Sequence, residues 1–381
     1  MRITQVTCSA APSEDDLARL AAARPHLVLV FGSIAQISQR ELLHGLRAAM
    51  PGATLAGCST AGEISNAGVG EDTLVLTALH FDAPDVRLAV TDLRDMNDSF
   101  AAGRRLAQAL SGAPLHNVML FGQGVNINGS ALIDGLRDGL PKGVVVSGGL
   151  AGDGGAFSKT LTLSTHAVSS DQLVAVGFGS ARTMLQHGSL HGWQPFGPAR
   201  LVTRSEGNVL YELDGEPALE VYRRYLGEHA AGLPATGLLF PFEMQAAKQP
   251  GPALIRTILG IDNATGSLVL AGDIVKGSHL RLMHASIDSL VNGAEAAAQS
   301  LDRAGAERAG DALALMVTCV GRKLVMGARV DEEVEAVANV LGAGCQRAGF
   351  YSYGEISPGI DGTECSLHNQ TMTITHLSEC A

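Results

Sequence analysis

The chain has 381 residues and a formal net charge of −11, from 27 Lys and Arg against 38 Asp and Glu. No basic run could neutralise a phosphate backbone, which argues against nucleic acid as a partner, and no apolar stretch approaches the roughly 20 residues needed to cross a bilayer. The six Cys include no Cys-x-x-Cys pair, so a structural zinc site of that kind is excluded. We therefore expect a cytoplasmic protein with reduced thiols, no nucleic-acid partner and no membrane partner.

The N-terminal part of the chain predicts a helix–strand–helix–strand unit. Residues 13–24 have the pattern of a capped helix, 26–31 that of an apolar strand, and 32–37 that of a loop. The spacing of Ser38 and Glu41 predicts a capping box at the start of a second helix, which ends at Met50. A strand at 54–56 then leads into the motif GCSTAGEIS, residues 57–65.

The same order of elements recurs twice more. A looser copy consists of helix 99–110, strand 118–121, helix 130–140, strand 144–146 and the motif Ala151-Gly152-Asp153, where the first copy has Ala61-Gly62-Glu63. The C-terminal copy consists of helix 286–304, strand 313–319, loop 321–323, a helix with apolar residues from 334 to 341, and the motif GFYSYGEIS at 349–357. The two long motifs agree at five of nine positions, so we predict an internal duplication of the helix–strand–helix–strand unit.

The segment between these copies predicts a domain boundary. Residues 184–201 are the least regular part of the chain and contain its one Trp. A helix at 217–226 and an antiparallel hairpin within 254–275 follow. We therefore expect an α/β (α+β) fold of two related domains, 1–195 and 196–381, each with mixed β-sheets flanked by helices.

The repeated Gly and Glu of the two long motifs predict a backbone that turns sharply at a strand end and aims a carboxylate at one place. Glu63 and Glu355 are therefore candidates for the wall of a ligand pocket, since the ends of parallel strands collect ligands. The alternative is that each carboxylate accepts hydrogen bonds from nearby backbone N–H groups and stabilises its own loop. The sequence leaves both interpretations open.

Arg322 follows a predicted strand in an otherwise acidic protein. It is a candidate to bind a carboxylate, including a haem propionate, by charge-assisted hydrogen bonds. The alternative is an ion pair with Glu355 in the neighbouring loop.

Three histidines are candidates for one haem-iron ligand, because neutral imidazole is a common metal ligand. His187 and His191 lie four residues apart beside Trp193, and His368 precedes the last predicted strand. Covalent haem attachment is excluded because Cys-x-x-Cys-His is missing. Any haem would therefore be held non-covalently.

Cys58 is the one residue of the first motif that suggests a nucleophile. The C-terminal copy has Phe350 in its place, and no Gly-x-Ser-x-Gly elbow occurs in the chain. We therefore interpret Cys58 as a buried structural residue and expect no enzyme. The alternative is a thiol-dependent enzyme that uses Cys58.

Several of these motifs, in this order, resemble the FIST family. They are GCSTAGEIS, SGGLAGD (147–153), VTRSEGNVLYELDGEPALEVY (202–222), TCVGRK (318–323), GFYSYGEISP and LHNQTMT (367–373). The resemblance covers nearly the whole chain and implies FIST N and FIST C domains in tandem. It also implies an intracellular sensory module that binds small ligands such as amino acids. One branch is similar to nitric-oxide-sensing haem proteins that act on a partner histidine kinase.

Together these observations predict a non-enzymatic sensory protein that binds haem b and nitric oxide and signals to a histidine kinase or other signalling protein, as in two-component systems. The alternative is a sensor of a small, amino-acid-like metabolite without haem. A homodimer is left open. The predicted binding residues are His187, His191, Trp193, Arg322, Tyr353, His368, Glu63 and Glu355.

Overall fold

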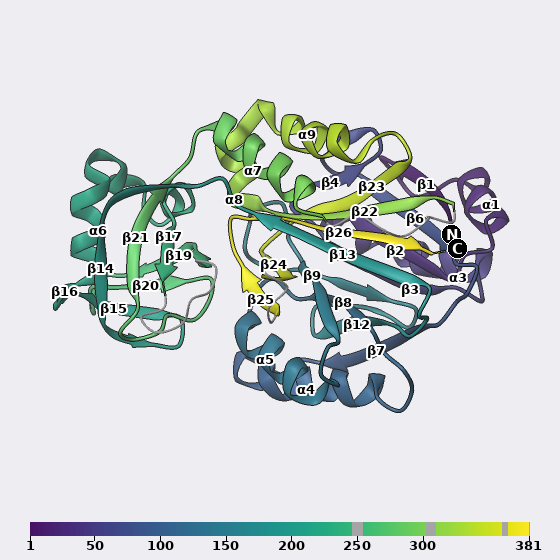
Figure 1. Ribbon diagram of the computed structural model, residues 1–381, viewed down its shortest axis with the longest axis horizontal. Coiled ribbons are helices and arrows are strands. Elements are labelled where there is room, and N and C mark those ends of the chain that lie inside the picture. The colour runs from purple at the N-terminus through teal and green to yellow at the C-terminus, as the bar shows by residue number, and fades with distance from the viewer. Residues whose placement is uncertain (246–253, 302–309, 360–364, 381) are drawn as a thin grey trace.

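The computed structural model describes residues 1–245, 254–301, 310–359 and 365–380. These residues form two lobes (Figure 1). The body contains three six-stranded sheets, and the small lobe contains one eight-stranded sheet. The predicted fold class, an α/β protein with mixed sheets flanked by helices, is confirmed.

The three sheets of the body share one plan. The first has the order β1 (Arg2–Cys8), β6 (Leu74–His80), β2 (Leu27–Gly32), β3 (Thr54–Ser59), β10 (Thr162–Ser164), β11 (Val168–Ser169). The second, read from its other edge, is β7 (Val86–Asp92), β12 (Gln172–Phe178), β8 (Asn117–Gly122), β9 (Val145–Leu150), β24 (Gly354–Pro358), β25 (Cys365–His368). The third is β13 (Thr183–Leu190), β26 (Met372–Glu379), β22 (Ala312–Cys319), β23 (Cys345–Ser352), β4 (Glu63–Ser65), β5 (Gly68–Gly70).

Each sheet therefore takes four strands from one copy of the repeated unit and a short hairpin from another copy. The parallel pairs β2–β3, β8–β9 and β22–β23 occupy equivalent places. The first copy gives its hairpin β4–β5 to the third sheet, the second gives β10–β11 to the first, and the third gives β24–β25 to the second. The predicted duplication is thus a threefold repeat in which no copy completes its sheet alone.

A glycine in each parallel pair fixes the register of the repeat. These glycines are Gly57, Gly148 and Gly349. They lie opposite Val30, Leu120 and Met316, in that order, and a Cβ atom on each glycine would overlap the carbonyl oxygen of its partner. Only a residue without a side chain lets the two strand backbones approach this closely.

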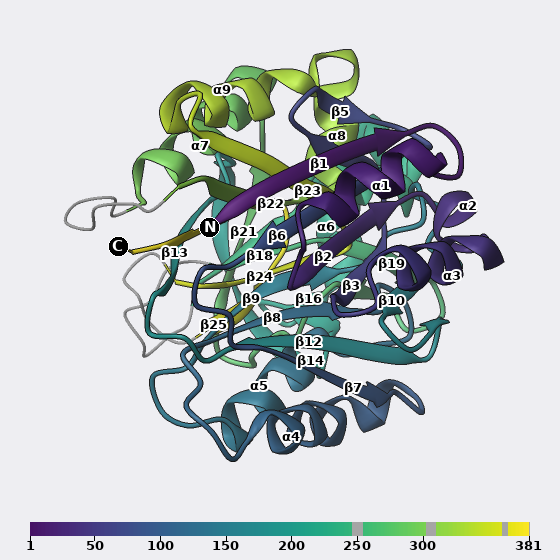
Figure 2. The ribbon, with the colours of Figure 1, turned by 90° about the vertical axis from the view of Figure 1, so that its right-hand side faces the viewer.

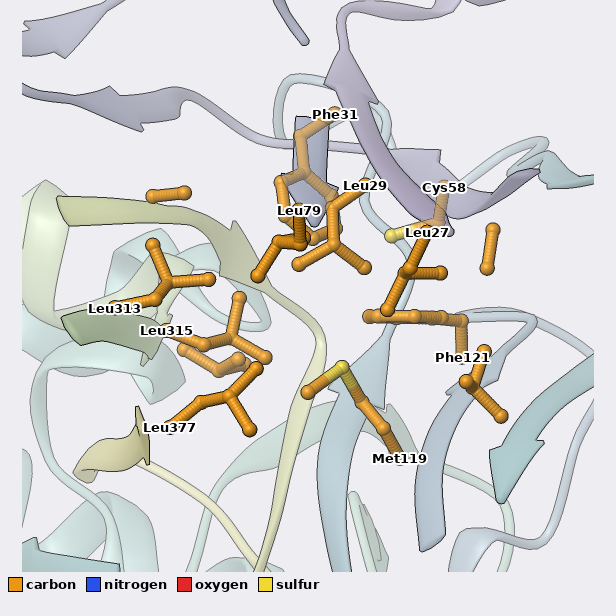
Figure 3. Packing of buried hydrophobic residues seen from close by; sticks show 14 of the residues in the cluster. Leu27, Leu29, Phe31, Cys58, Leu79, Met119, Phe121, Leu313, Leu315 and Leu377 are labelled. Atoms are coloured by element: carbon orange, nitrogen blue, oxygen red, sulfur yellow. The ribbon is translucent and has the colours of Figure 1, made fainter. Parts of the chain in front are cut away.

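A pair of helices covers the outer face of each sheet, on three sides of the body (Figure 2). The pairs are α1 (Glu14–Ala22) with α3 (Arg40–Ala49), α4 (Ser99–Leu110) with α5 (Gly129–Gly139), and α7 (Ile287–Gln299) with α9 (Asp331–Leu341). The inner faces meet in one shared core, where Phe31, Phe121 and Phe350 lie with ring centroids 4.8 to 6.3 Å apart (Figure 3). The two chain ends also meet, because the Met1 ammonium pairs with Glu379 at 3.0 Å.

The small lobe is inserted into the third copy. The chain leaves the body after β13 and returns at α7 (Figure 1). The lobe contains the strands β14 (Gln194–Glu206), β15 (Val209–Leu213), β16 (Glu216–Pro217), β17 (Phe242–Gln245), β18 (Leu254–Arg256), β19 (Ile258–Asp262), β20 (Ser267–Leu270) and β21 (His279–His284), with helix α6 (Ala218–Leu226) and the 3-10 helices η2 (Gly227–Gly232) and η3 (Ala235–Leu239). These strands pair antiparallel around a separate apolar core.

Most predicted elements are confirmed. Helix α4 has exactly the predicted bounds, Ser13 forms the capping box of α1, and β19 and β20 form the predicted hairpin. Residues 302–304 of the predicted helix 286–304 lie outside the described residues.

Three local predictions are wrong. Ser38 does not begin a helix, because residues 34–37 already form the short helix α2 (Ile34–Ile37) with Ser33 as its N-cap, and α3 starts at Arg40. The predicted loop 321–323 lies within helix α8 (Val320–Met326). The irregular segment 184–201 forms most of β13 and the first part of β14, since strand pairing supplies the order that the local sequence does not show.

The expected division into domains 1–195 and 196–381 stays a prediction about folding units. In the observed topology both halves contribute strands to the second and third sheets, as when β4 pairs with β23. Within the described residues, no helix is both long and apolar enough to span a membrane.

Candidate functional site

A cavity of about 540 Å³ lies where the body meets the small lobe. We call it the junction cavity. The body contributes residues after β8 and β9, and the small lobe contributes η3 and the strands β19 and β20. Its lining is Met96, Gly124, Val125, Asn126, Ile127, Gly129, Leu150, Gly155, Phe157, Asn208, Pro234, Ala235, Leu238, Ile258, Leu259, Val269, Leu270, Ala271 and Tyr353. It is thus an apolar cavity shared by both lobes, the usual setting of a small-molecule site.

Tyr353 anchors one wall of the junction cavity. Its hydroxyl donates a hydrogen bond to the Asp153 carboxylate and accepts one from the backbone N–H of Gly155 at 2.9 Å. The ring of Phe157 stacks on the Tyr353 ring with centroids 4.1 Å apart. Asp153 also accepts from the backbone N–H groups of Phe157 and Ser158, both at 2.8 Å. Burial opposes ionisation of this carboxyl, but the hydrogen bonds from Tyr353 and the backbone lower its pKa.

Two residues of the junction cavity have a backbone conformation that is rare for side chains with a Cβ. Asn126 has φ of 56° and Phe157 has φ of 52°, and they are two of six such non-glycine residues in the described chain. Left-handed conformation is costly for a bulky residue such as Phe, and such outliers cluster at ligand sites. The hydrogen bonds of Asp153 hold Phe157 in this conformation beside the cavity.

Changing Tyr353 to Phe is expected to loosen this wall. The change leaves Asp153 and the amide of Gly155 without their phenol partner. Because both groups are half-buried and Asp153 keeps its backbone N–H bonds, we expect a loss of about 1 kcal/mol. Hydrogen exchange at the amides of Gly155 and Phe157 should become faster. Tyr211→Phe is the control, because the Tyr211 hydroxyl forms no hydrogen bond with the described residues. Equal exchange rates in wild type and Tyr353→Phe would contradict this role.

A second cavity, of about 380 Å³, lies on the other side of the Asp153 loop. Its lining includes the carboxylates of Glu63, Glu71, Asp72 and Asp153. The ammonium of Lys323 donates to the carbonyl of Ala61 and pairs with Glu71, both at 2.8 Å. The polar groups of this acidic cavity are thus largely paired with one another.

The repeated Glu of the two long motifs has a structural role. Glu63 accepts hydrogen bonds from the backbone N–H of Thr73 at 3.0 Å and from its hydroxyl at 2.7 Å, and Glu355 accepts one from the N–H of Thr371 at 3.1 Å. Glu63 thereby joins the start of hairpin β4–β5 to the start of β6, and Glu355 joins hairpin β24–β25 to the start of β26. This is the loop-stabilising alternative, although Glu63 also lines the acidic cavity.

In the middle copy, the position equivalent to Glu63 and Glu355 is occupied by Thr162 and not by Asp153. Thr162 lies beside Cys58 in the ladder, as Glu63 lies beside Phe350 and Glu355 beside Gly149. The Thr162 hydroxyl donates to the carbonyl of Gln172 at 2.9 Å. The predicted correspondence between Asp153 and Glu63 is therefore wrong, since the middle copy inserts the Asp153 loop before its hairpin.

Burial raises the pKa of Glu355 to about 8, although the hydroxyl of Ser352 and the N–H of Thr371 favour the ionised form. The folded chain then holds a proton that the unfolded chain loses near the ordinary Glu pKa of about 4.3. The contribution of Glu355 to the free energy of unfolding therefore falls as pH rises from about 4.3 to about 8.

Glu355→Gln should remove this loss. Burial lowers the pKa of His187, His191 and His368 to about 4, so these groups add stability as pH rises to about 6.5 and little above it. Between pH 6.5 and 8.5 the variant should lose less unfolding free energy in urea than wild type does. Glu71→Gln, at an exposed site, should follow the wild type, and an unchanged slope in Glu355→Gln would contradict the raised pKa.

Arg322 is buried at the junction of the two lobes. Its Nη1 donates to the carbonyl of His191, just before the small lobe, and its Nη2 donates to the carbonyl of Leu290 at 3.0 Å, just after it. Its ion-pair partner is Glu333, at 2.7 Å, and both side chains have 0% exposed surface. The predicted pair with Glu355 is therefore replaced by one with Glu333, because α9 brings Glu333 to the guanidinium.

The three candidate histidines line neither the junction cavity nor the acidic cavity. His187 Nδ1 lies 3.3 Å from the hydroxyl of Thr375, and His191 Nδ1 accepts from the N–H of Trp193 at 2.9 Å. His368 Nε2 donates to the carbonyl of Ser357 at 3.1 Å. Trp193 is buried and donates from Nε1 to the carbonyl of Gln370 at 3.0 Å. Of the predicted binding residues, Tyr353 lines the junction cavity and Glu63 the acidic cavity.

A haem-iron ligand among these three histidines stays a prediction. Across the described ranges, no group of three or more His, Cys, Asp or Glu side chains is placed to hold a metal ion. Cys58 lies in the shared core with 0% exposed surface, and burial raises its pKa well above the ordinary value (Figure 3). The predicted burial of Cys58 is confirmed.

Most of the junction cavity was not predicted from the sequence. Phe157, Asn126 and the η3 residues of the small lobe were not among the predicted binding residues. Two glycine-rich runs directly after buried strands, GQGVNING at 122–129 and GDGG at 152–155, were the signal available in the sequence. Such runs let loops turn at the carboxyl ends of strands, where ligands bind.

Comparisons with known proteins agree with the motifs. The FIST N domain model matches residues 26–216 and the FIST C domain model matches residues 218–358. An uncharacterized protein of Mycobacterium tuberculosis is 28% identical over 352 residues, covering 89% of this chain and 88% of that protein. One of Methanocaldococcus jannaschii is 27% identical over 218 residues, 54% of this chain and 42% of its own. Among solved structures, a cyanuric acid hydrolase from A. caulinodans covers 100% of this chain and 99% of its own at 10% identity, with a TM-score of 0.39.

Proposed function

The chain belongs to the FIST family, and we propose that it is a non-enzymatic sensory protein whose junction cavity binds a small molecule. FIST domains are sensory modules. The observation that carries the proposal is the cavity itself, of about 540 Å³, built by both lobes and bordered by the left-handed residues Asn126 and Phe157.

The placement of the cavity suggests how binding becomes a signal. A ligand that contacts Tyr353 of the body and Leu238 of the small lobe stabilises the arrangement in which both walls are present. The two lobes are also joined by the chain segments that Arg322 holds and by direct hydrogen bonds, such as the one from Gln370 Nε2 to the carbonyl of Leu238 at 2.8 Å. Binding therefore changes the surface that the lobes together offer to a partner, for which a histidine kinase is our proposal.

A thermal-shift screen of the full chain against small metabolites tests this function. A ligand should raise the melting temperature in a saturable way. Ala235→Trp, which places a bulky ring at the cavity, should abolish that rise. Ala231→Trp, at an exposed site outside the lining, should keep it. A flat response across the panel, or a rise that persists in Ala235→Trp, would count against the junction cavity as the site.

Haem b with nitric oxide is the alternative that the family resemblance implies. It is tested by purifying the protein from haem-supplemented cells and recording its absorption spectrum. A Soret band that shifts with nitric oxide would support a gas sensor. A spectrum without that band removes the haem hypothesis and leaves the small-molecule proposal in place.

A further inference from the structure

Resting on the proposed ligand site, we infer that the ligand of the junction cavity is an uncharged, mainly apolar molecule with few hydrogen-bonding groups. This differs from a polar, amino-acid-like metabolite, for which Glu63, Glu355 and Arg322 were the expected anchors. The structure places none of those three side chains in the lining of the junction cavity.

Charge is the first argument. Among the described residues, no Asp, Glu, Lys, Arg or His lines the cavity. The carboxylate of Asp153, bonded to Tyr353, lines the acidic cavity on the other side of the loop, where it accepts the backbone N–H groups of Phe157 and Lys159. An ionic ligand would lose its hydration in the junction cavity without gaining a counter-charge.

The polar side chains in the lining give the second argument. The hydroxyl of Tyr353 already donates to Asp153 and accepts from Gly155, and the Nδ2 of Asn208 donates to the carbonyl of Leu270 at 2.8 Å. Of the polar side chains in the lining, that of Asn126 alone has no hydrogen bond to another described residue. A ligand with many donors or acceptors would therefore leave several of them unpaired.

Both lobes supply the apolar surface. The body contributes Val125, Ile127, Leu150 and the ring of Phe157, and the small lobe contributes Leu238, Ile258, Leu259, Val269 and Leu270. Leu259 is 44% exposed, which is unusual for a strand leucine and leaves apolar surface for a bound molecule to cover. An apolar ligand would remove this surface from water on both sides at once.

Two fluorescent probes with the same ring system separate the charge classes. N-phenyl-1-naphthylamine is neutral, and 1-anilinonaphthalene-8-sulfonate adds a sulfonate. With the full chain, the neutral probe should show saturable fluorescence at one site, and the sulfonate should bind at least about tenfold more weakly, since a charge buried without a partner is disfavoured.

Leu259→Asp places a carboxylate at the rim of the cavity and should weaken the neutral probe at least about tenfold, for the same reason. Because Leu259 is exposed, the variant should fold, as circular dichroism can verify. Val275→Asp is the matched control, since Val275 is a 57% exposed residue of the same lobe outside the lining. It should bind the neutral probe as wild type does.

The outcomes distinguish the ligand class from the site. Equal affinity for both probes, lost together in Leu259→Asp, overturns the uncharged class and keeps the junction cavity as a binding site. So does stabilisation by a charged metabolite that Ala235→Trp removes. Two results overturn the ligand class and the proposed function together. One is neutral-probe binding that Leu259→Asp leaves unchanged. The other is a flat metabolite screen combined with saturable binding by neither probe.

Discussion

Replacing Arg322 with Met is expected to lower the free energy of unfolding by about 3–5 kcal/mol, the range found when one partner of a buried ion pair is removed. The change leaves the Glu333 carboxylate with 0% exposed surface and no cation. The hydroxyl of Tyr351 still donates to it at 2.7 Å, but a hydrogen bond does not replace the lost charge. Urea denaturation at pH 7 measures the effect.

A second substitution separates the charge from the packing. Arg322→Met combined with Glu333→Gln removes the uncompensated charge and should recover part of the lost stability, since a Gln carbonyl still accepts from Tyr351. Arg329→Met is the control, because Arg329 pairs with Glu332 and Asp288 at the surface and should change stability little. A loss in Arg329→Met as large as in Arg322→Met would contradict the role assigned to the buried pair.

Arg322 also matters for the relation between the lobes. Its guanidinium bonds the carbonyls of His191 and Leu290, which flank the small lobe on its two connecting segments. Amide exchange in both segments should increase in Arg322→Met even where the body remains folded. Exchange that rises in the body but not in these segments would show that the pair stabilises the core alone.

Changing Gly349 to Ala is the other substitution with a large expected effect. A Cβ atom there overlaps the carbonyl oxygen of Met316, which belongs to the backbone and cannot move aside as a flexible side chain can. We expect a loss of more than about 3 kcal/mol, beyond the usual 1–3 kcal/mol of overpacking. Thermal and urea unfolding of the variant measure the loss of stability. A variant that cannot be expressed as folded protein would also agree with the expected loss.

Gly344→Ala is the matched control in the same segment. Nothing lies within 4 Å of a Cβ atom at Gly344. Its stability should be equal to that of the wild type or slightly higher, since Ala restricts the unfolded chain more than Gly does. If Gly349→Ala were as stable as Gly344→Ala, the close approach of β22 and β23 would not be a requirement of the fold.

The threefold repeat explains why both ends of the chain are needed for one body. The family models meet between residues 216 and 218, at the start of α6 in the small lobe. The third sheet nevertheless combines β4 from near the N-terminus with β22, β23 and β26 from near the C-terminus. A fragment cut between the two matches would leave strand edges of the second and third sheets without their partners, which exposes unpaired backbone groups.

The sequence by itself determined the local elements and the family. Helix α4, the cap of α1 and the hairpin of β19 and β20 follow from periodicity, capping and turn residues, which act over a few neighbours. The two GEIS motifs likewise identified the repeated unit, and their loop-stabilising alternative matches the hydrogen bonds that Glu63 and Glu355 accept.

Only the tertiary structure decided which parts of the chain meet. The exchange of hairpins between copies depends on strands such as β4 and β23, almost 300 residues apart, and no local pattern specifies that pairing. The same holds for Glu333 as the partner of Arg322 and for Thr162 as the counterpart of Glu63. The junction cavity is the clearest case, because its described lining joins loops of the body to η3 and two strands of the small lobe and carries no charged side chain. Such a site becomes visible only when the lobes are packed together.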